Sequence, residues 1–103
     1  MGIFLNARWE PEQNSGEVKG QVFEIACLSW CTASHRITPV LFKYVGEDSL
    51  VYTVQDINVR SCDDKNYNGL PSKEYDCEAV VGGFKRPFRL VYFILENRWI
   101  MRI

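Results

Sequence analysis

The chain has 103 residues and a formal net charge of −1, with 47% hydrophobic and 14% aromatic residues. This length is enough for one domain and too short for two, and the composition excludes a disordered chain. The longest apolar run, from Leu90 to Leu95, is far shorter than the roughly 20 residues that a membrane-spanning helix needs.

The first residues lack a basic start followed by a long apolar stretch. We therefore expect no secretory signal peptide and a cytoplasmic protein that does not enter a membrane. In that compartment the four cysteines stay reduced and act as small apolar side chains. If a signal peptide has been lost from the chain, two disulfides with three alternative pairings become possible. The cysteines are Cys27, Cys31, Cys62 and Cys77.

Residues 1–20 are expected to form an amino-terminal extension, and residues 21–103 a single β domain. Within the extension, residues 3–9 form either a strand added to a sheet edge or a frayed terminus. Residues 10–20 are expected to be a loop, because Pro11 and Gly16 lie in a polar stretch.

Alternation of apolar and polar side chains predicts strands at 22–30, 40–45 and 50–55. In the first strand, Val22, Ala26, Leu28 and Trp30 lie opposite Phe23, Ile25 and Cys27, although the same residues also tolerate a helix. The second begins at Pro39, which cannot donate to a sheet ladder. A hairpin through Gly46 joins the second strand to the third, which extends past a bend through 56–60.

Residues 62–72 are expected to form a long loop with a turn at Asn68-Gly69, since both residues tolerate positive φ. A strand at 73–81 follows, with one buried face and one solvent-exposed face. The exposed face would carry Glu74, Asp76 and Glu78. The glycine pair 82–83 turns the chain into a strand at 84–95, and a final strand covers 99–103.

These elements predict an all-β fold of five to six antiparallel strands in a meander. The sheet is either curled or closed into a small SH3-like or OB-like barrel. Val91, Phe93 and Leu95 lie on the second face of their strand, where a flat open sheet would leave them in water. They favour closure of the barrel, a covering layer or a contact between subunits.

The spacing of reactive side chains does not favour an enzyme. Cys27, Cys31 and His35 would share a face only on a helix. On a strand the first two lie about 13 Å apart, which is too far for one metal ion. Around Asp63-Asp64 the central glycine and closing glutamate of a calcium loop are missing. The outward pair of Asp76 and Glu78 has no predicted cleft.

The sequence also contains no phosphate-binding loop or nucleophile elbow. We therefore expect a non-enzymatic protein without cofactor or metal.

Charge is unevenly distributed, with −5 over residues 46–81 and +4 over residues 82–103. Attraction between neighbouring strands of one sheet explains this division, and a basic face for an acidic partner is the alternative. The basic side chains of the last hairpin form a candidate binding surface: Lys85, Arg86, Arg89, Arg98 and Arg102.

The expected function is that of a protein-interaction module, which binds another protein or a second copy of itself. The alternative is binding of single-stranded nucleic acid through the basic and aromatic residues of 84–102, because aromatic rings stack on bases and cations contact phosphates. The sequence pI of about 5.8 disfavours this alternative, since nucleic-acid-binding domains usually exceed about 9.

Several short motifs occur between residues 25 and 101: Ile37-x-Pro39, Tyr52-x-Val54, Asp56-Ile57-x-Val59-Arg60, Tyr75-x-Cys77 and Asn97-Arg98-Trp99. With these the chain resembles a family of small uncharacterised bacterial β-meander proteins. The resemblance implies a compact antiparallel sheet or barrel in a bacterial cytoplasm and implies no activity. The longer amino-terminal segment and the extra cysteines depart from the family pattern.

Overall fold

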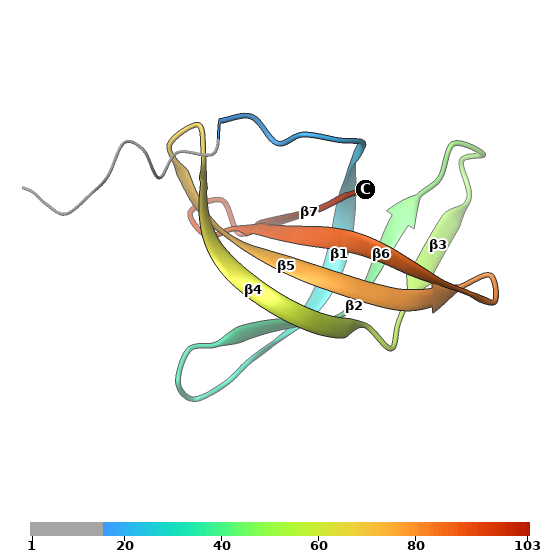
Figure 1. Ribbon diagram of the computed structural model, residues 1–103, viewed down its shortest axis with the longest axis horizontal. Coiled ribbons are helices and arrows are strands. Elements are labelled where there is room, and N and C mark those ends of the chain that lie inside the picture. The colour runs from blue at the N-terminus through green and yellow to red at the C-terminus, as the bar shows by residue number, and fades with distance from the viewer. Residues whose placement is uncertain (1–15) are drawn as a thin grey trace, which may run out of the picture.

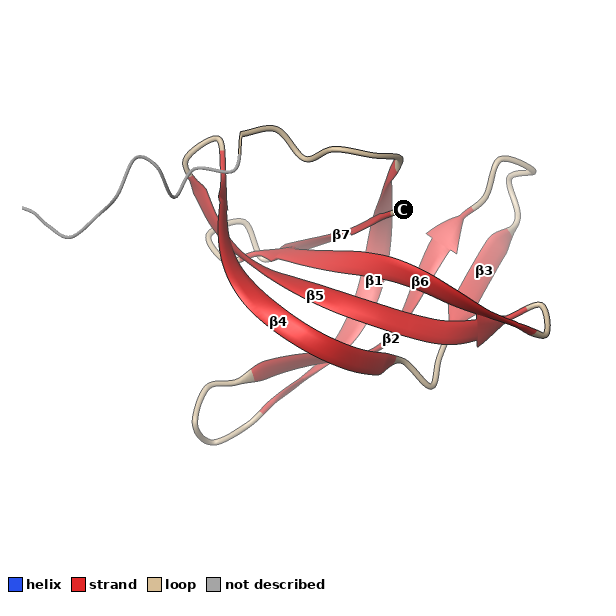
Figure 2. Cartoon of the chain, in the orientation of Figure 1, coloured by secondary structure: helices blue, strands red, loops and turns tan. Residues whose placement is uncertain are grey.

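A computed structural model describes residues 16–103, which form one antiparallel sheet whose strands are joined by turns and short loops (Figures 1 and 2). The expectation for residues 3–9 lies outside the described residues. The all-β meander predicted from the sequence is confirmed. The seven strands are β1 (Val22–Cys31), β2 (Ile37–Val45), β3 (Val51–Val54), β4 (Asn58–Tyr67), β5 (Leu70–Val81), β6 (Phe84–Phe93) and β7 (Arg98–Arg102).

The strand order is β3-β2-β1-β7-β6-β5-β4, so two meanders are joined where β1 pairs with β7. The edge strands β3 and β4 follow one another in the chain but do not pair, and the sheet curls without closing (Figure 1). Of the two predicted architectures, the curled sheet is therefore present and the closed barrel is not. The expected count of five to six strands is too low. Within residues 16–103 no helix is long and apolar enough to cross a membrane.

The additional strand is β4, in the region where the sequence predicted a long loop over 62–72. Its residues pair with β5 from Asn58↔Glu78 to Tyr67↔Leu70. The prediction was wrong because β4 is an edge strand, and polar and charged side chains are normal on an edge. The turn prediction at Asn68 and Gly69 is confirmed, with φ angles of 53° and 88°.

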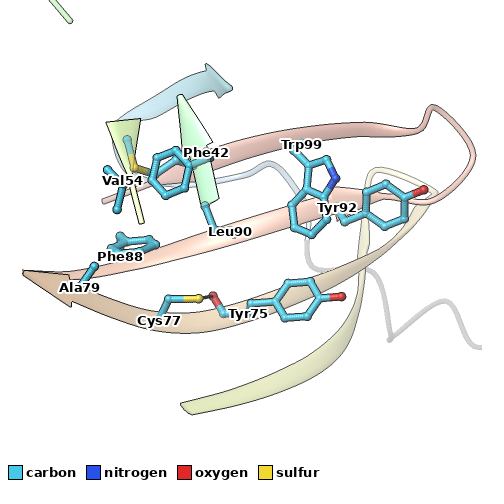
Figure 3. Packing of buried hydrophobic residues seen from close by; sticks show 10 residues of the cluster. Phe42, Val54, Tyr75, Cys77, Ala79, Phe88, Leu90, Tyr92 and Trp99 are labelled. Atoms are coloured by element: carbon cyan, nitrogen blue, oxygen red, sulfur yellow. Dashed lines mark hydrogen bonds between the residues drawn. The ribbon is translucent and has the colours of Figure 1, made fainter. Parts of the chain in front are cut away.

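The concave face of the curled sheet carries the main core (Figure 3). Phe42 of β2 contacts Phe88 of β6 edge to face, with ring centroids 5.5 Å apart, so the two meanders pack against each other across the concave face. At the other end of this core, Trp99 packs between Tyr75 and Tyr92. The buried residues of this core are Phe42, Val54, Tyr75, Cys77, Ala79, Phe88, Leu90, Tyr92, Trp99 and Met101.

A second, smaller cluster lies on the opposite, convex face of β6 and β7. It contains Tyr67, Val91, Phe93 and Ile100, with Val18 packed against it. The chain itself therefore covers two of the three residues that suggested barrel closure or a subunit contact. The third, Leu95, is exposed.

The convex face of β5 also differs from the expectation of an exposed row of acids. Asp76 and Glu78 are partly exposed, but Glu74 is buried, with 2% of its surface accessible. Alternation predicted correctly that Glu74 faces away from the main core. The second cluster and the neighbouring arginines bury it on the other side of the sheet.

Candidate functional site

The five basic residues of the predicted binding surface do not form one surface. Register places Arg86 on the concave face, beside Phe88, and Lys85, Arg89, Arg98 and Arg102 on the convex face. Lys85 Nζ lies 3.9 Å from Glu78, and Arg98 pairs with both Glu24 and Glu96. Carboxylates of the same sheet thus partly neutralise the convex-face cations.

Arg89 and Arg102 converge on the buried Glu74. Arg89 Nη1 donates to Glu74 Oε2 at 2.9 Å, and Arg102 Nη2 donates to the same oxygen at 3.4 Å. The Tyr67 hydroxyl donates to Glu74 Oε1. Arg102 Nη1 also donates to the carbonyl of Lys19 at 2.9 Å, which attaches the chain before β1 to the sheet. This is the geometry of a structural ion-pair network.

Arg86 lies near the tip of the β5–β6 hairpin, with its guanidinium 5.8 Å from the ring centroid of the exposed Phe84. In this pair an exposed aromatic ring and a cation lie side by side, as the predicted nucleic-acid binding requires. Nucleic-acid binding through it stays a prediction. A labelled oligonucleotide titrated at low salt tests it, and Arg86→Ala should weaken the binding.

The four cysteines are free thiols that differ in exposure. Burial raises the pKa of Cys27 and of Cys77 to about 12, so both remain protonated at neutral pH. Cys31 is exposed at the end of β1, and His35 lies in the turn that follows. Among residues 16–103 no group of three or more potential metal ligands occurs.

Several exposed apolar side chains of the first meander lie on its convex face. Phe42, Cys27 and Val54 share the concave side, so their strand neighbours point outward. Trp30 of β1 is 67% exposed, which is unusual for a tryptophan within a strand. We call the following residues the apolar face: Leu28, Trp30, Val45 and Val51.

The apolar face extends over three strands as two groups, which the outward-facing Lys43 separates. Leu28 pairs with Leu41, and Val45 pairs with Val51. A bulge in β2 lies beside this face, where Leu28 and Ser29 are paired with Leu41 and Pro39 and Val40 has no partner. Apolar side chains that gather on one exposed surface make that surface a candidate interaction site.

Sequence alternation placed Leu28 and Trp30 opposite Phe23, but it gave no sign that their side stays uncovered. Comparisons with models of protein families, with curated proteins and with solved structures find no significant match to this chain. The function is therefore inferred from its own surfaces.

Proposed function

We propose that this protein is a non-enzymatic interaction module that associates with a second copy of itself through the apolar face. The observation that carries the proposal is the exposure of Trp30, Leu28 and Val45 on one sheet surface. The apolar face, and not Val91 and Phe93, is the proposed contact between subunits, because the second cluster of the same chain buries those two residues.

Charge complementarity favours a second copy as the occupant. Lys43 points outward within the apolar face, and no described carboxylate forms an ion pair with it. Lys43 and Glu47 lie two positions on either side of Val45. If two copies stack with a two-fold axis beside Val45, each Lys43 meets the other copy's Glu47. An isologous contact of this kind is self-complementary.

The remaining features of this region do not oppose association. A formal net charge of −1 produces little repulsion between copies. The adjoining edge strand β3 carries no charged side chain. Because only a few side chains make up the apolar face, we expect a weak dimer with a dissociation constant in about the micromolar range.

Sedimentation velocity over a range of concentrations tests the proposal. The wild type should shift from monomer to dimer, and Val45→Lys should weaken the dimer at least about tenfold, because like charges then face each other at the axis. Val80→Lys is the matched control, since Val80 is an equally exposed valine on β5 and should leave the dimer unchanged. A species that stays monomeric up to about millimolar concentration contradicts the proposal.

A charge exchange separates self-association from nonspecific adhesion. Lys43→Glu and Glu47→Lys should each weaken the dimer, because each places two like charges opposite one another. The double variant with both changes should restore it. If the double variant is as weak as the single variants, the proposed stacking is wrong.

A further inference from the structure

A pocket of about 600 Å³ opens at the end of the concave face where the sheet does not close. The β1–β2 hairpin forms one side of it, and strands β4, β5 and β6 form the other. The size lies in the range of 300–1,000 Å³ that is typical of small-molecule sites. The wall includes the apolar side chains of Ile37 on β2, Val59 on β4 and Ile94, which directly follows β6.

The charged side chains that line this pocket are all cationic. Arg36 and Lys73 belong to the lining, and no aspartate or glutamate does. Lys73 pairs with Asp64, which is highly exposed and outside the lining. Arg36 forms no ion pair with a described carboxylate. The pocket therefore offers positive charge to a ligand.

Two tyrosines provide a fixed aromatic wall. Tyr75 stacks on Trp99 with ring centroids 5.5 Å apart, and Tyr92 lies 4.9 Å from the same ring (Figure 3). The Tyr75 hydroxyl donates to the carbonyl of Ile37 at 2.5 Å, and the Tyr92 hydroxyl donates to Asn97 Oδ1 at 2.9 Å. The core buries most of both rings and the protein satisfies both hydroxyls, so the ring edges that line the pocket are held in place for apolar contact.

The turn at the mouth of the pocket contains a residue whose backbone conformation is rare for side chains other than glycine. His35 has a φ of 64°, in the left-handed region that glycine adopts most easily. The turn is closed by bonds from the amides of His35 and Arg36 to Thr32. Strained residues of this kind concentrate at ligand sites, and His35 itself lines the pocket.

From these observations we infer that the concave pocket binds a small organic anion with a planar apolar body. The anionic group lies at Arg36 and Lys73, with His35 beside it, and the body lies against Tyr75 and Tyr92. The site is separate from the apolar face, so it can be occupied in either the monomer or the dimer.

Binding of 8-anilinonaphthalene-1-sulfonate tests this inference, with N-phenyl-1-naphthylamine as the same ring system without the sulfonate. The sulfonate should bind more tightly than the neutral compound, and Arg36→Gln with Lys73→Gln should weaken it by roughly tenfold. Lys19→Gln with Lys85→Gln removes the same charge from exposed positions outside the pocket and the apolar face, and should leave the affinity unchanged. Equal affinities for both compounds, or no binding of the sulfonate, would overturn the inference.

Amide NMR shifts locate the bound probe. They should move at Arg36, Tyr75 and Tyr92, whereas movement confined to Leu28 and Trp30 would place the probe on the apolar face and contradict the inference. His35→Gly should raise the Tm by about 4 °C, because glycine relaxes the turn, while it lowers the affinity for the sulfonate. Unchanged affinity in a stabilised His35→Gly variant would remove His35 from the site.

Discussion

Phe42→Ala should lower the free energy of unfolding by about 4 kcal/mol, because a large buried ring is removed and a cavity remains. Phe42 is 0% exposed and pairs with Cys27 on β1 and Val54 on β3. Its ring also contacts Phe88 on β6, 5.5 Å away between centroids. It is thus one of the side chains that join the two meanders across the concave face.

Urea unfolding of the wild type and of Phe42→Ala measures this loss. Phe84→Ala is the control, because it removes the same side chain from an exposed position and should cost less than about 1 kcal/mol. Tryptophan fluorescence and circular dichroism should give coincident transitions if the meanders unfold together. A loss below about 1 kcal/mol for Phe42→Ala would show that the first meander does not pack on β6 as described.

The strands whose two faces differ in polarity could be predicted from the sequence. Period-two alternation identified β1, β2, β3 and the three C-terminal strands, and it placed Phe88, Leu90 and Tyr92 on one face. It predicted strand for the first residues of β4, within 56–60, and failed for the rest, whose polar edge resembles a loop. The polarity of the side chains does not distinguish an edge strand from a loop, whereas the backbone pairing with β5 does.

What covers each face could not be predicted, because that depends on residues distant in sequence. Alternation predicts on which face of the sheet Glu74 lies. It does not predict that Tyr67 and Arg102 contact Glu74 on that face. The same limit applies to the apolar face and to the pocket. The pocket brings His35 and Tyr92 together only because the sheet curls. The five basic residues do not form one surface because Arg86 lies on the other face of β6, and the carboxylates that pair with the remaining four come from residues distant in sequence or from the adjacent turn.

Glu74→Gln should lower the free energy of unfolding by about 3 kcal/mol, which corresponds to a fall in Tm of about 15 °C. The change removes the carboxylate that holds Arg89 and Arg102 and leaves a neutral amide in a buried site. Burial and the hydrogen bond to Glu74 raise the pKa of Tyr67 to about 12, so its hydroxyl remains a donor to either side chain.

Asp64→Asn is the control for Glu74→Gln. Like Glu74, Asp64 is a carboxylate in an ion pair, here with Lys73, but Asp64 is highly exposed. Exposed pairs contribute little, so we expect a loss below about 0.5 kcal/mol. Thermal unfolding at neutral pH compares the two variants. Similar losses would mean that Glu74 is not buried in the network described.

The effect of Glu74→Gln should also depend on pH. Burial by itself raises the pKa of Glu74, but the hydrogen bonds from Tyr67 and Arg89 and the charge of Arg102 outweigh it, so the pKa lies below the ordinary value. A carboxyl with a lowered folded-state pKa stabilises the fold above its unfolded pKa of about 4.3, and this stability is lost as the pH falls through the folded pKa.

The difference in unfolding free energy between wild type and Glu74→Gln should therefore stay constant from about pH 7 to pH 5 and shrink below about pH 4. Other carboxylates titrate in both proteins, so their contributions largely cancel in the difference. Urea titrations at stepped pH values measure it. A difference that does not change down to about pH 2 would mean that the carboxylate charge of Glu74 contributes nothing to stability, and that only packing distinguishes the two side chains.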